Sequence, residues 1–195
     1  MTTLSLQARA AGIRPPLAET PIDEAGVVRA TLGANPHAFD DIVRLHSRRI
    51  HNFLYQMTRH LQDAEDLTQQ TFIKAFHNLH RFDCSRPLIN WLLTIARRTA
   101  LNHFRSARKW ESVPDDLACT DPSPARSAED HDQAENLWAR ARRVLSRREF
   151  EILWLRFAEE LSTEDTARIA GLTQTHVKVL VYRARQQLVK ADPSP

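Results

Sequence analysis

Residues 163–188, TEDTARIAGLTQTHVKVLVYRARQQL, carry the clearest structural signal in this chain. The first eight of them predict a short helix that carries Glu164 and Asp165 in the first turn, where the helix dipole favours negative charge. Gly171 can end this helix in a left-handed conformation. Thr173 can then cap a second helix. The stretch therefore predicts two short helices joined by a tight turn.

The small residues of this stretch have the spacing of a helix-turn-helix unit. Ala167 allows the two helices to approach, Gly171 makes the turn, and Val177 fills the angle between the helices. An ordinary helical hairpin is the alternative interpretation.

The second helix of the unit has two distinct faces. Its inward face is apolar and comprises Val177, Leu180, Val181, Ala184 and Leu188. Its outward face and margins hold the candidate DNA-binding side chains, which are Thr175, His176, Lys178, Val179, Tyr182 and Arg183. Short polar groups near a helix start can reach base edges, and neighbouring cations can meet phosphates. Val179 is either a contact for a thymine methyl group or a tolerated exposed valine.

The remainder of the chain predicts an all-α protein with two small helical domains joined by a flexible linker. The chain has only four glycines in 195 residues, which argues against a turn-rich β fold. We expect a flexible tail over residues 1–21, a first domain over 22–110, an acidic, proline-containing linker over 111–132 and a second domain over 133–191.

Local signals place several helix starts. Asn35 and Pro36 predict a cap and a first-turn proline for the first long helix of the first domain. Asp63 is the expected cap of the next helix, and Pro87 is expected in the first turn of the one after it. The sequence SRRE at residues 146–149 matches a capping box.

Charge is distributed unevenly along the chain. Residues 96–110 and 173–190 contain five and four basic residues and no acidic ones, whereas residues 111–135 contain eight acidic residues and one arginine. Two basic stretches on amphipathic helices favour nucleic-acid binding, although each alone could be a solvated helix face.

The cysteine spacing and the length of the apolar runs indicate the cellular compartment. Cys84 and Cys119 are far apart and form no CxxC pattern, so we expect a cytoplasmic protein without a disulfide framework. No apolar run is long enough to predict membrane insertion, and the N-terminus lacks a signal core.

Four stretches resemble one known family, the extracytoplasmic-function sigma factors of bacterial RNA polymerase. LSRREFEILWLRFAEELSTEDTARIAGLTQTHVKVLVYRARQQL, residues 145–188, resembles sigma region 4. HAFDDIVRLHSRRIHNFL, residues 37–54, LQDAEDLTQQTFIKAFHNLHRF, residues 61–82, and PLINWLLTIARRTALNHFR, residues 87–105, resemble sigma region 2. The motifs DAEDLTQQTF, NWLLTIAR and VKVLVYRAR, in this order, make the resemblance specific.

The resemblance implies an alternative sigma factor that binds core RNA polymerase and directs promoter recognition, DNA melting and transcription initiation. It implies no metal, no cofactor and no catalytic residue, and it implies an anti-sigma factor as a further partner. Region 2 would grip the polymerase clamp helices and capture the −10 element, and region 4 would read the −35 element of promoter DNA. The implied polymerase-binding side chains are Asp63, Glu65, Asp66, Gln69 and Gln70.

The loop at residues 82–86 and the helix after it are the expected −10 interface. The loop offers an aromatic ring, small polar groups and a cation, which suit an unstacked base. A plain interhelical turn is the alternative. The candidate residues are Phe82, Asp83, Ser85, Arg86, Arg98, Asn102, Arg105 and Arg108. Trp91 fits the apolar series of that helix better than a role as a melting wedge.

This sequence departs from the family pattern at a few positions. Glu is usual in the family at Gln70, Asn at Arg98 and Asp at Asn102, and Ser-Arg is usual at Val179-Leu180. Thr166 replaces an aliphatic residue, and its hydroxyl can bond back to its own helix. The changes at the DNA-facing positions leave the base preferences open.

Two rival functions are testable. A stand-alone helix-turn-helix regulator would share the C-terminal unit, but it would lack the first domain and would bind duplex DNA unaided. A metalloenzyme would need a fuller ligand set than His77 and His80, which have helical ligand spacing but no HExxH or Cys/His partners.

Overall fold

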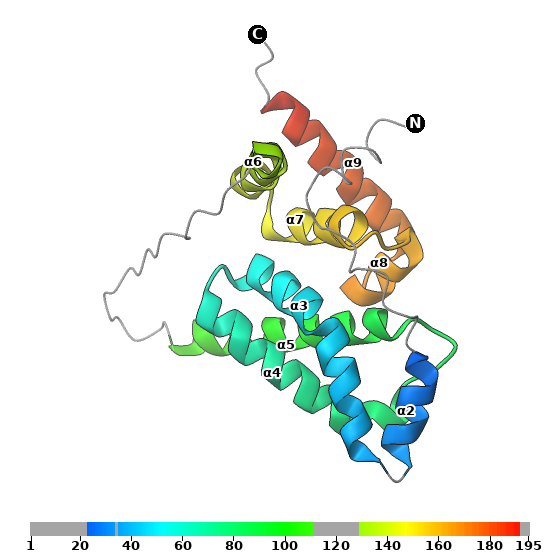
Figure 1. The fold of residues 1–195 in the computed structure, drawn as a ribbon. Coiled ribbons are helices and arrows are strands. Elements are labelled where there is room, and N and C mark those ends of the chain that lie inside the picture. The colour runs from blue at the N-terminus through cyan, green and yellow to red at the C-terminus, as the bar shows by residue number, and fades with distance from the viewer. Residues whose placement is uncertain (1–22, 34, 111–128, 192–195) are drawn as a thin grey trace. The chain divides into compact units, whose positions relative to one another are not determined.

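The structure is a computed structural model that describes residues 23–33, 35–110 and 129–191 (Figure 1). Within those ranges every regular element is a helix, and the elements form two compact units. The predicted all-α, two-domain architecture is confirmed. The predicted tail, and residues 111–128 of the predicted linker, lie outside the described residues.

In its described residues, 23–33 and 35–110, the first unit contains four α-helices and two short 3-10 helices. Its elements are α2 (Glu24–Leu32), η1 (Pro36–Ala38), α3 (Phe39–Thr58), α4 (Leu61–Asn78), η2 (Leu79–Arg81) and α5 (Leu88–Trp110). α3, α4 and α5 pack against one another, and α2 packs against α3. The core is aliphatic and aromatic, with Ile50, Phe53 and Leu54 of α3 and Leu92 of α5 almost fully buried.

Three predicted helix starts in this unit differ from the structure. Asn35 makes no side-chain cap bond, and Pro36 opens the 3-10 turn η1 before α3. The cap of α4 is His60, whose Nδ1 accepts the backbone N–H of Asp63 at 3.2 Å, so the prediction of Asp63 as the cap is wrong. Pro87 immediately precedes α5. A histidine cap depends on ring orientation, which sequence pattern does not encode.

The second unit contains α6 (Glu129–Val144), α7 (Arg147–Leu153), the π-helical turn η3 (Trp154–Ala158), α8 (Thr163–Ala170) and α9 (Gln174–Lys190). α6 begins a few residues earlier than expected, inside the predicted linker.

The predicted capping box is present at the start of α7. Ser146 Oγ accepts the N–H of Glu149 at 3.3 Å, and Glu149 Oε2 accepts the N–H of Ser146 at 3.1 Å. Glu149 Oε1 accepts a hydrogen bond from Gln187 Nε2 at 3.1 Å. One carboxylate therefore caps α7 and ties it to the C-terminal half of α9.

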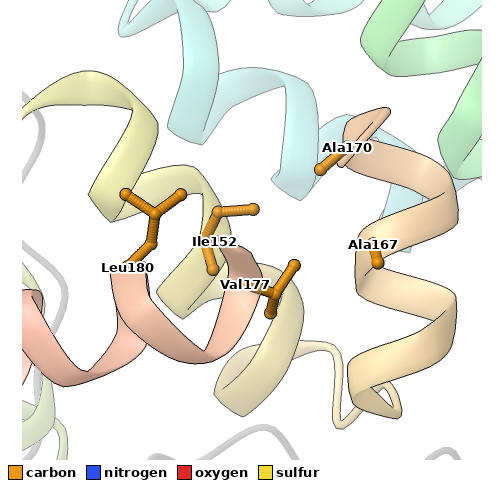
Figure 2. Packing of buried hydrophobic residues seen from close by; sticks show 5 residues of the cluster. All are labelled: Ile152, Ala167, Ala170, Val177 and Leu180. Carbon is orange, nitrogen blue, oxygen red and sulfur yellow. The ribbon is translucent and has the colours of Figure 1, made fainter. Parts of the chain in front are cut away.

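The helix-turn-helix unit has the predicted geometry. α8 ends at Gly171, which has φ +65° in the left-handed region. Thr173 Oγ1 accepts the N–H of His176 at 3.2 Å and caps α9. Figure 2 shows the apolar cluster that joins α7, α8 and α9, which consists of Ile152, Ala167, Ala170, Val177 and Leu180.

The side chain of Thr166 on α8 is fully buried, and among the described residues its hydroxyl has no hydrogen-bond partner. The bond back to its own helix, which a threonine hydroxyl can make, is therefore not formed.

Candidate nucleic-acid and protein interfaces

The outward face of α9 is accessible along its length. Val177, Leu180 and Ala184 are buried, and this fixes the rotation of the helix. All six candidate side chains are exposed, namely Thr175, His176, Lys178, Val179, Tyr182 and Arg183. Val179 and Tyr182 are 39% and 64% exposed, large values for apolar and aromatic groups. The face is therefore free within the second unit to meet another molecule.

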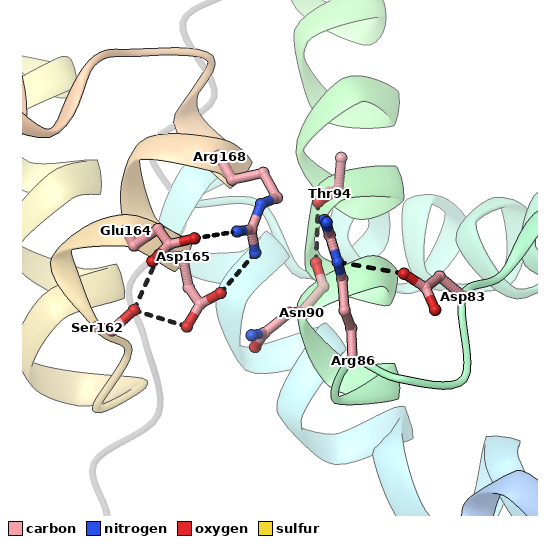
Figure 3. A network of polar contacts seen from close by, with 8 residues as sticks. All are labelled: Asp83, Arg86, Asn90, Thr94, Ser162, Glu164, Asp165 and Arg168. Atoms are coloured by element: carbon pink, nitrogen blue, oxygen red, sulfur yellow. Dashed lines mark hydrogen bonds and ion pairs between the residues drawn. The ribbon is translucent and has the colours of Figure 1, made fainter.

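Two arginines of the second unit, one on α9 and one on α8, have partners inside that unit. The Arg185 guanidinium lies 5.1 Å from the centre of the Phe157 ring, a cation–π contact that sequence reasoning missed. Arg168 on α8 pairs with Glu164 at 2.5 Å and Asp165 at 2.8 Å (Figure 3). The positive charge of Arg168 is therefore largely compensated locally.

The outer face of α4 carries most of the predicted polymerase-binding residues. Glu65, Asp66, Gln69 and Gln70 are all exposed. Ile73, one helical turn beyond Gln69, is 57% exposed and extends this face with an apolar group. Sequence reasoning missed Ile73, although its i+4 spacing from Gln69 was a readable signal.

Asp63 differs from the other four residues. Its side chain is 35% exposed, and its carboxylate lies 3.3 Å from His103 Nε2 on α5 and 3.5 Å from His60 Nδ1. Asp63 therefore connects the start of α4 to α5 within the unit. It has less freedom than its neighbours to bind another protein.

The loop before α5 is organised by Asp83. Its Oδ1 accepts the N–H of Ser85 at 3.0 Å, and its Oδ2 lies 3.4 Å from Arg86 Nε (Figure 3). Hydrogen bonds from the Ser85 side chain and N–H, with the nearby Arg86 charge, hold the pKa of the Asp83 carboxyl below its usual value. The loop is thus an ordered turn with exposed polar groups at its tip.

The aromatic ring expected to receive a base is only partly available. The Phe82 ring lies 5.3 Å from the Trp91 ring at an interplanar angle of 45°, and both residues are half-buried. Trp91 therefore supports Phe82 from α5.

α5 presents its candidate phosphate contacts on one side. Arg98, Asn102 and Arg105 are exposed and spaced at i, i+4 and i+7, so they share one helix face. The side chain of Arg108 lies outside the described residues.

Two further features of the described residues concern the metalloenzyme alternative and the expected absence of a membrane-spanning helix. Within residues 23–33, 35–110 and 129–191, no group of three His, Cys, Asp or Glu side chains is arranged to hold a metal ion. No helix in the same ranges is both long and apolar enough to cross a bilayer.

Comparison with known proteins identifies both units. The family model for Sigma-70 region 2 matches residues 42–110, and the model for Sigma-70 region 4 matches residues 137–188. The two matches together define a transcription-initiation factor with one region in each unit. They give no support to the stand-alone regulator, which would lack region 2.

Individual relatives agree with the family models. The RNA polymerase sigma factor YlaC of Bacillus subtilis is 30% identical over 162 residues, which cover 78% of this chain and 91% of that protein. The ECF RNA polymerase sigma factor SigM of Bacillus subtilis is 28% identical over 154 residues, which cover 76% and 91%. The chain therefore belongs to the extracytoplasmic-function sigma factors of the sigma-70 family, and it is an alternative sigma factor that directs transcription initiation.

A solved structure supports the same assignment. The sigma factor RpoE of Bartonella quintana, in complex with the anti-sigma factor NepR, is 26% identical and has a TM-score of 0.61. The similarity covers 78% of this chain and 94% of that one.

Proposed function

We propose that this sigma factor uses three surfaces. The exposed face of α4 binds the clamp helices of core RNA polymerase, the loop at residues 82–86 with α5 binds the −10 element, and α9 reads the −35 element. The protein acts in the cytoplasm, without a cofactor and without catalytic residues of its own. The observation that carries the proposal is the division of α9 into a buried and an exposed face.

The geometry of α9 supports base reading at its N-terminal end. Thr175 and His176 lie in the first turn and Val179 one turn later, so their side chains can enter a major groove together. Arg183 lies one turn further along and can reach either a base or the DNA backbone. Lys178 is at the margin of the face, where a phosphate contact is expected.

The α4 face supports protein binding through mixed chemistry. Glu65, Asp66, Gln69 and Gln70 offer acidic and amide groups, and exposed Ile73 adds apolar area beside them. An interface needs some apolar burial for affinity and a polar rim for specificity. Asp63 contributes indirectly in this arrangement, because His103 and His60 hold its carboxylate.

The loop supports capture of an unpaired base. Ser85 and Arg86 are exposed at its tip, and Phe82 forms an aromatic wall supported by Trp91. Asp83 fixes the turn and holds Arg86 by an ion pair. On α5, Arg98, Asn102 and Arg105 can follow the phosphates of the captured strand, and Arg108 is proposed to continue that row.

An anti-sigma factor is proposed as a second protein partner. The related RpoE is a sigma factor solved in complex with the anti-sigma factor NepR. Co-purification of the tagged full chain from its own host, with and without excess core polymerase, tests this partner. A partner that core polymerase displaces is expected, and recovery of polymerase subunits alone argues against an inhibitor.

The −35 assignment is tested with the reconstituted holoenzyme. Lys178→Ala should weaken binding to all −35 variants about equally and lower the salt dependence, because one phosphate contact releases about one counterion. Val179→Ser should instead relax preference at one −35 position, at a cost of about 1–3 kcal/mol for a good base contact. The measurement is competitive binding of single-base −35 variants at two salt concentrations.

Lys190→Ala is the matched control for the charge change. Lys190 is exposed on the same helix, about 18 Å further along at 1.5 Å per residue. It should leave the salt dependence unchanged. If Val179→Ser keeps every base preference while Lys178→Ala changes one, the assigned groove-facing set is wrong.

A further inference from the structure

α2 lies outside the region 2 match, which begins at residue 42. The helix nevertheless packs against α3 and against η2, the 3-10 turn that leads into the loop at residues 82–86. α2 therefore lies beside the start of that loop.

Glu24, in the first turn of α2, lies near both α3 and the start of α5. Its Oε1 lies 3.1 Å from Nε2 of His46 on α3, and the His46 side chain is only 8% exposed. The backbone N–H of Leu88, the first residue of α5, is also near enough to this carboxylate to lower its pKa. One side chain thus joins α2, α3 and the start of α5.

The electrostatic setting of Glu24 favours the charged carboxylate. The hydrogen bond from His46, the charges of His46 and Arg49, and the Leu88 N–H together hold the pKa of Glu24 below its usual value, against the opposing effect of burial. A carboxylate at a helix N-terminus also interacts favourably with the helix dipole and with N–H groups that lack intrahelical partners. Glu24 therefore interacts with the N-terminus of α5 from another helix.

The position of this contact relates it to the loop. Leu88 follows Arg86 by two residues, and the intervening Pro87 has no N–H of its own to anchor the chain. At the other end of the loop, η2 packs against α2. α2 therefore contacts the chain on both sides of the loop.

We propose that Glu24 is a positioning residue for −10 recognition. It fixes the point where the loop enters α5. The inference rests on the proposed function, in which this loop captures a −10 base. Glu24 itself touches no DNA in this arrangement. It determines the geometry in which Ser85 and Arg86 meet the base.

The test uses holoenzyme reconstituted with the full chain and a fluorescent single-stranded oligonucleotide that carries the −10 element. Glu24→Gln keeps the shape of the side chain and an acceptor oxygen but removes the charge, and Glu24→Ala removes both. We expect binding of the oligonucleotide to fall about threefold for Gln and about tenfold for Ala, as for the loss of one charge-assisted hydrogen bond. Affinity for core polymerase and for duplex −35 DNA should not change.

Asp41→Asn is the matched control, because it makes the same carboxylate-to-amide change in the first unit. Asp41 pairs with Arg44 at 2.9 Å on α3 and is expected to leave −10 binding unchanged. Hydrogen exchange at residues 82–88 provides a second measurement, and it should speed up in both Glu24 variants.

The outcomes separate the inference from the proposed function. If the Glu24 variants bind the oligonucleotide like the wild type while Arg86→Ala binds it less well, the inference is wrong and the role of the loop stands. If Arg86→Ala also binds normally, the −10 role of the loop fails, and the inference fails with it. If the Glu24 variants lose core and oligonucleotide affinity in equal proportion, Glu24 supports only the fold and the positioning role is refuted.

Discussion

The turn of the helix-turn-helix unit allows a quantitative prediction for Gly171→Ala. Gly171 has φ +65°, and a Cβ added there would meet no atom within 4 Å beyond its own chain neighbours, so the substitution adds no clash with the surrounding structure. The cost is then only that of a left-handed backbone for a residue with a Cβ, about 1–2 kcal/mol. Alanine also reduces the entropy of the unfolded chain, which returns about 0.4–1 kcal/mol. The net destabilisation of the second unit should therefore be about 1 kcal/mol.

Hydrogen exchange of the α8 and α9 amides in the full chain measures this value for the second unit alone. Gly171→Asn should cost less, because asparagine tolerates the left-handed region better than alanine. Exchange in α3 and α4 should stay unchanged and serves as the internal control. A loss above about 3 kcal/mol, or an asparagine variant less stable than the alanine variant, would refute the reasoning, because backbone conformation would not be the main cost.

Three further predictions concern other contacts. Asp66→Arg reverses a charge on the α4 face, so it should weaken holoenzyme assembly while thermal stability stays nearly unchanged. A core-binding titration measures this effect, and Asp40→Arg, the same charge reversal on α3, is the control. Equal effects of the two changes would contradict the clamp assignment. Glu149→Ala removes the capping-box acceptor and the acceptor of Gln187 Nε2, so the free energy of unfolding of the second unit should fall by about 1–3 kcal/mol. Denaturant unfolding followed by tryptophan fluorescence measures this loss. An unchanged free energy would mean that water replaces both bonds. The pKa of Glu24 is lower in the folded chain than its usual value of 4.5, so the stabilisation by its carboxylate is fully present above that value and is lost as the pH falls below it. The unfolding temperatures of wild type and Glu24→Gln should therefore differ at neutral pH and converge in acid. A difference that stays constant with pH would argue against this linkage.

The second unit was predictable from sequence because its signals are local. The bounds of α8, the left-handed Gly171 and the Thr173 cap all follow from residue types at fixed offsets, and the structure confirms them. The inward face of α9 follows from helical periodicity, since apolar residues three and four apart must share one side. The exposure of the candidate DNA-binding face is a consequence of that rotation.

The contacts that the sequence did not predict join residues far apart in the chain. Glu24 meets His46 and Leu88, and Asp63 meets His103, and neither arrangement leaves a periodic pattern. The His60 cap and the unpartnered Thr166 hydroxyl depend on side-chain orientation in the packed unit. Each of these is set by tertiary packing, which can override local propensity.

The separation of the two faces of α9 has a consequence for how such proteins diverge. Residues that hold the helix against α7 and α8 are different from those that project outward, so a substitution at Thr175 or Val179 has little packing to disturb. Under the proposed −35 role of α9, duplicated copies of such a gene can acquire new promoter preferences through a few outward changes without passing through unstable intermediates. The same property makes α9 a practical starting point for engineering orthogonal regulators, in which a library varies the outward positions and leaves the buried ones untouched.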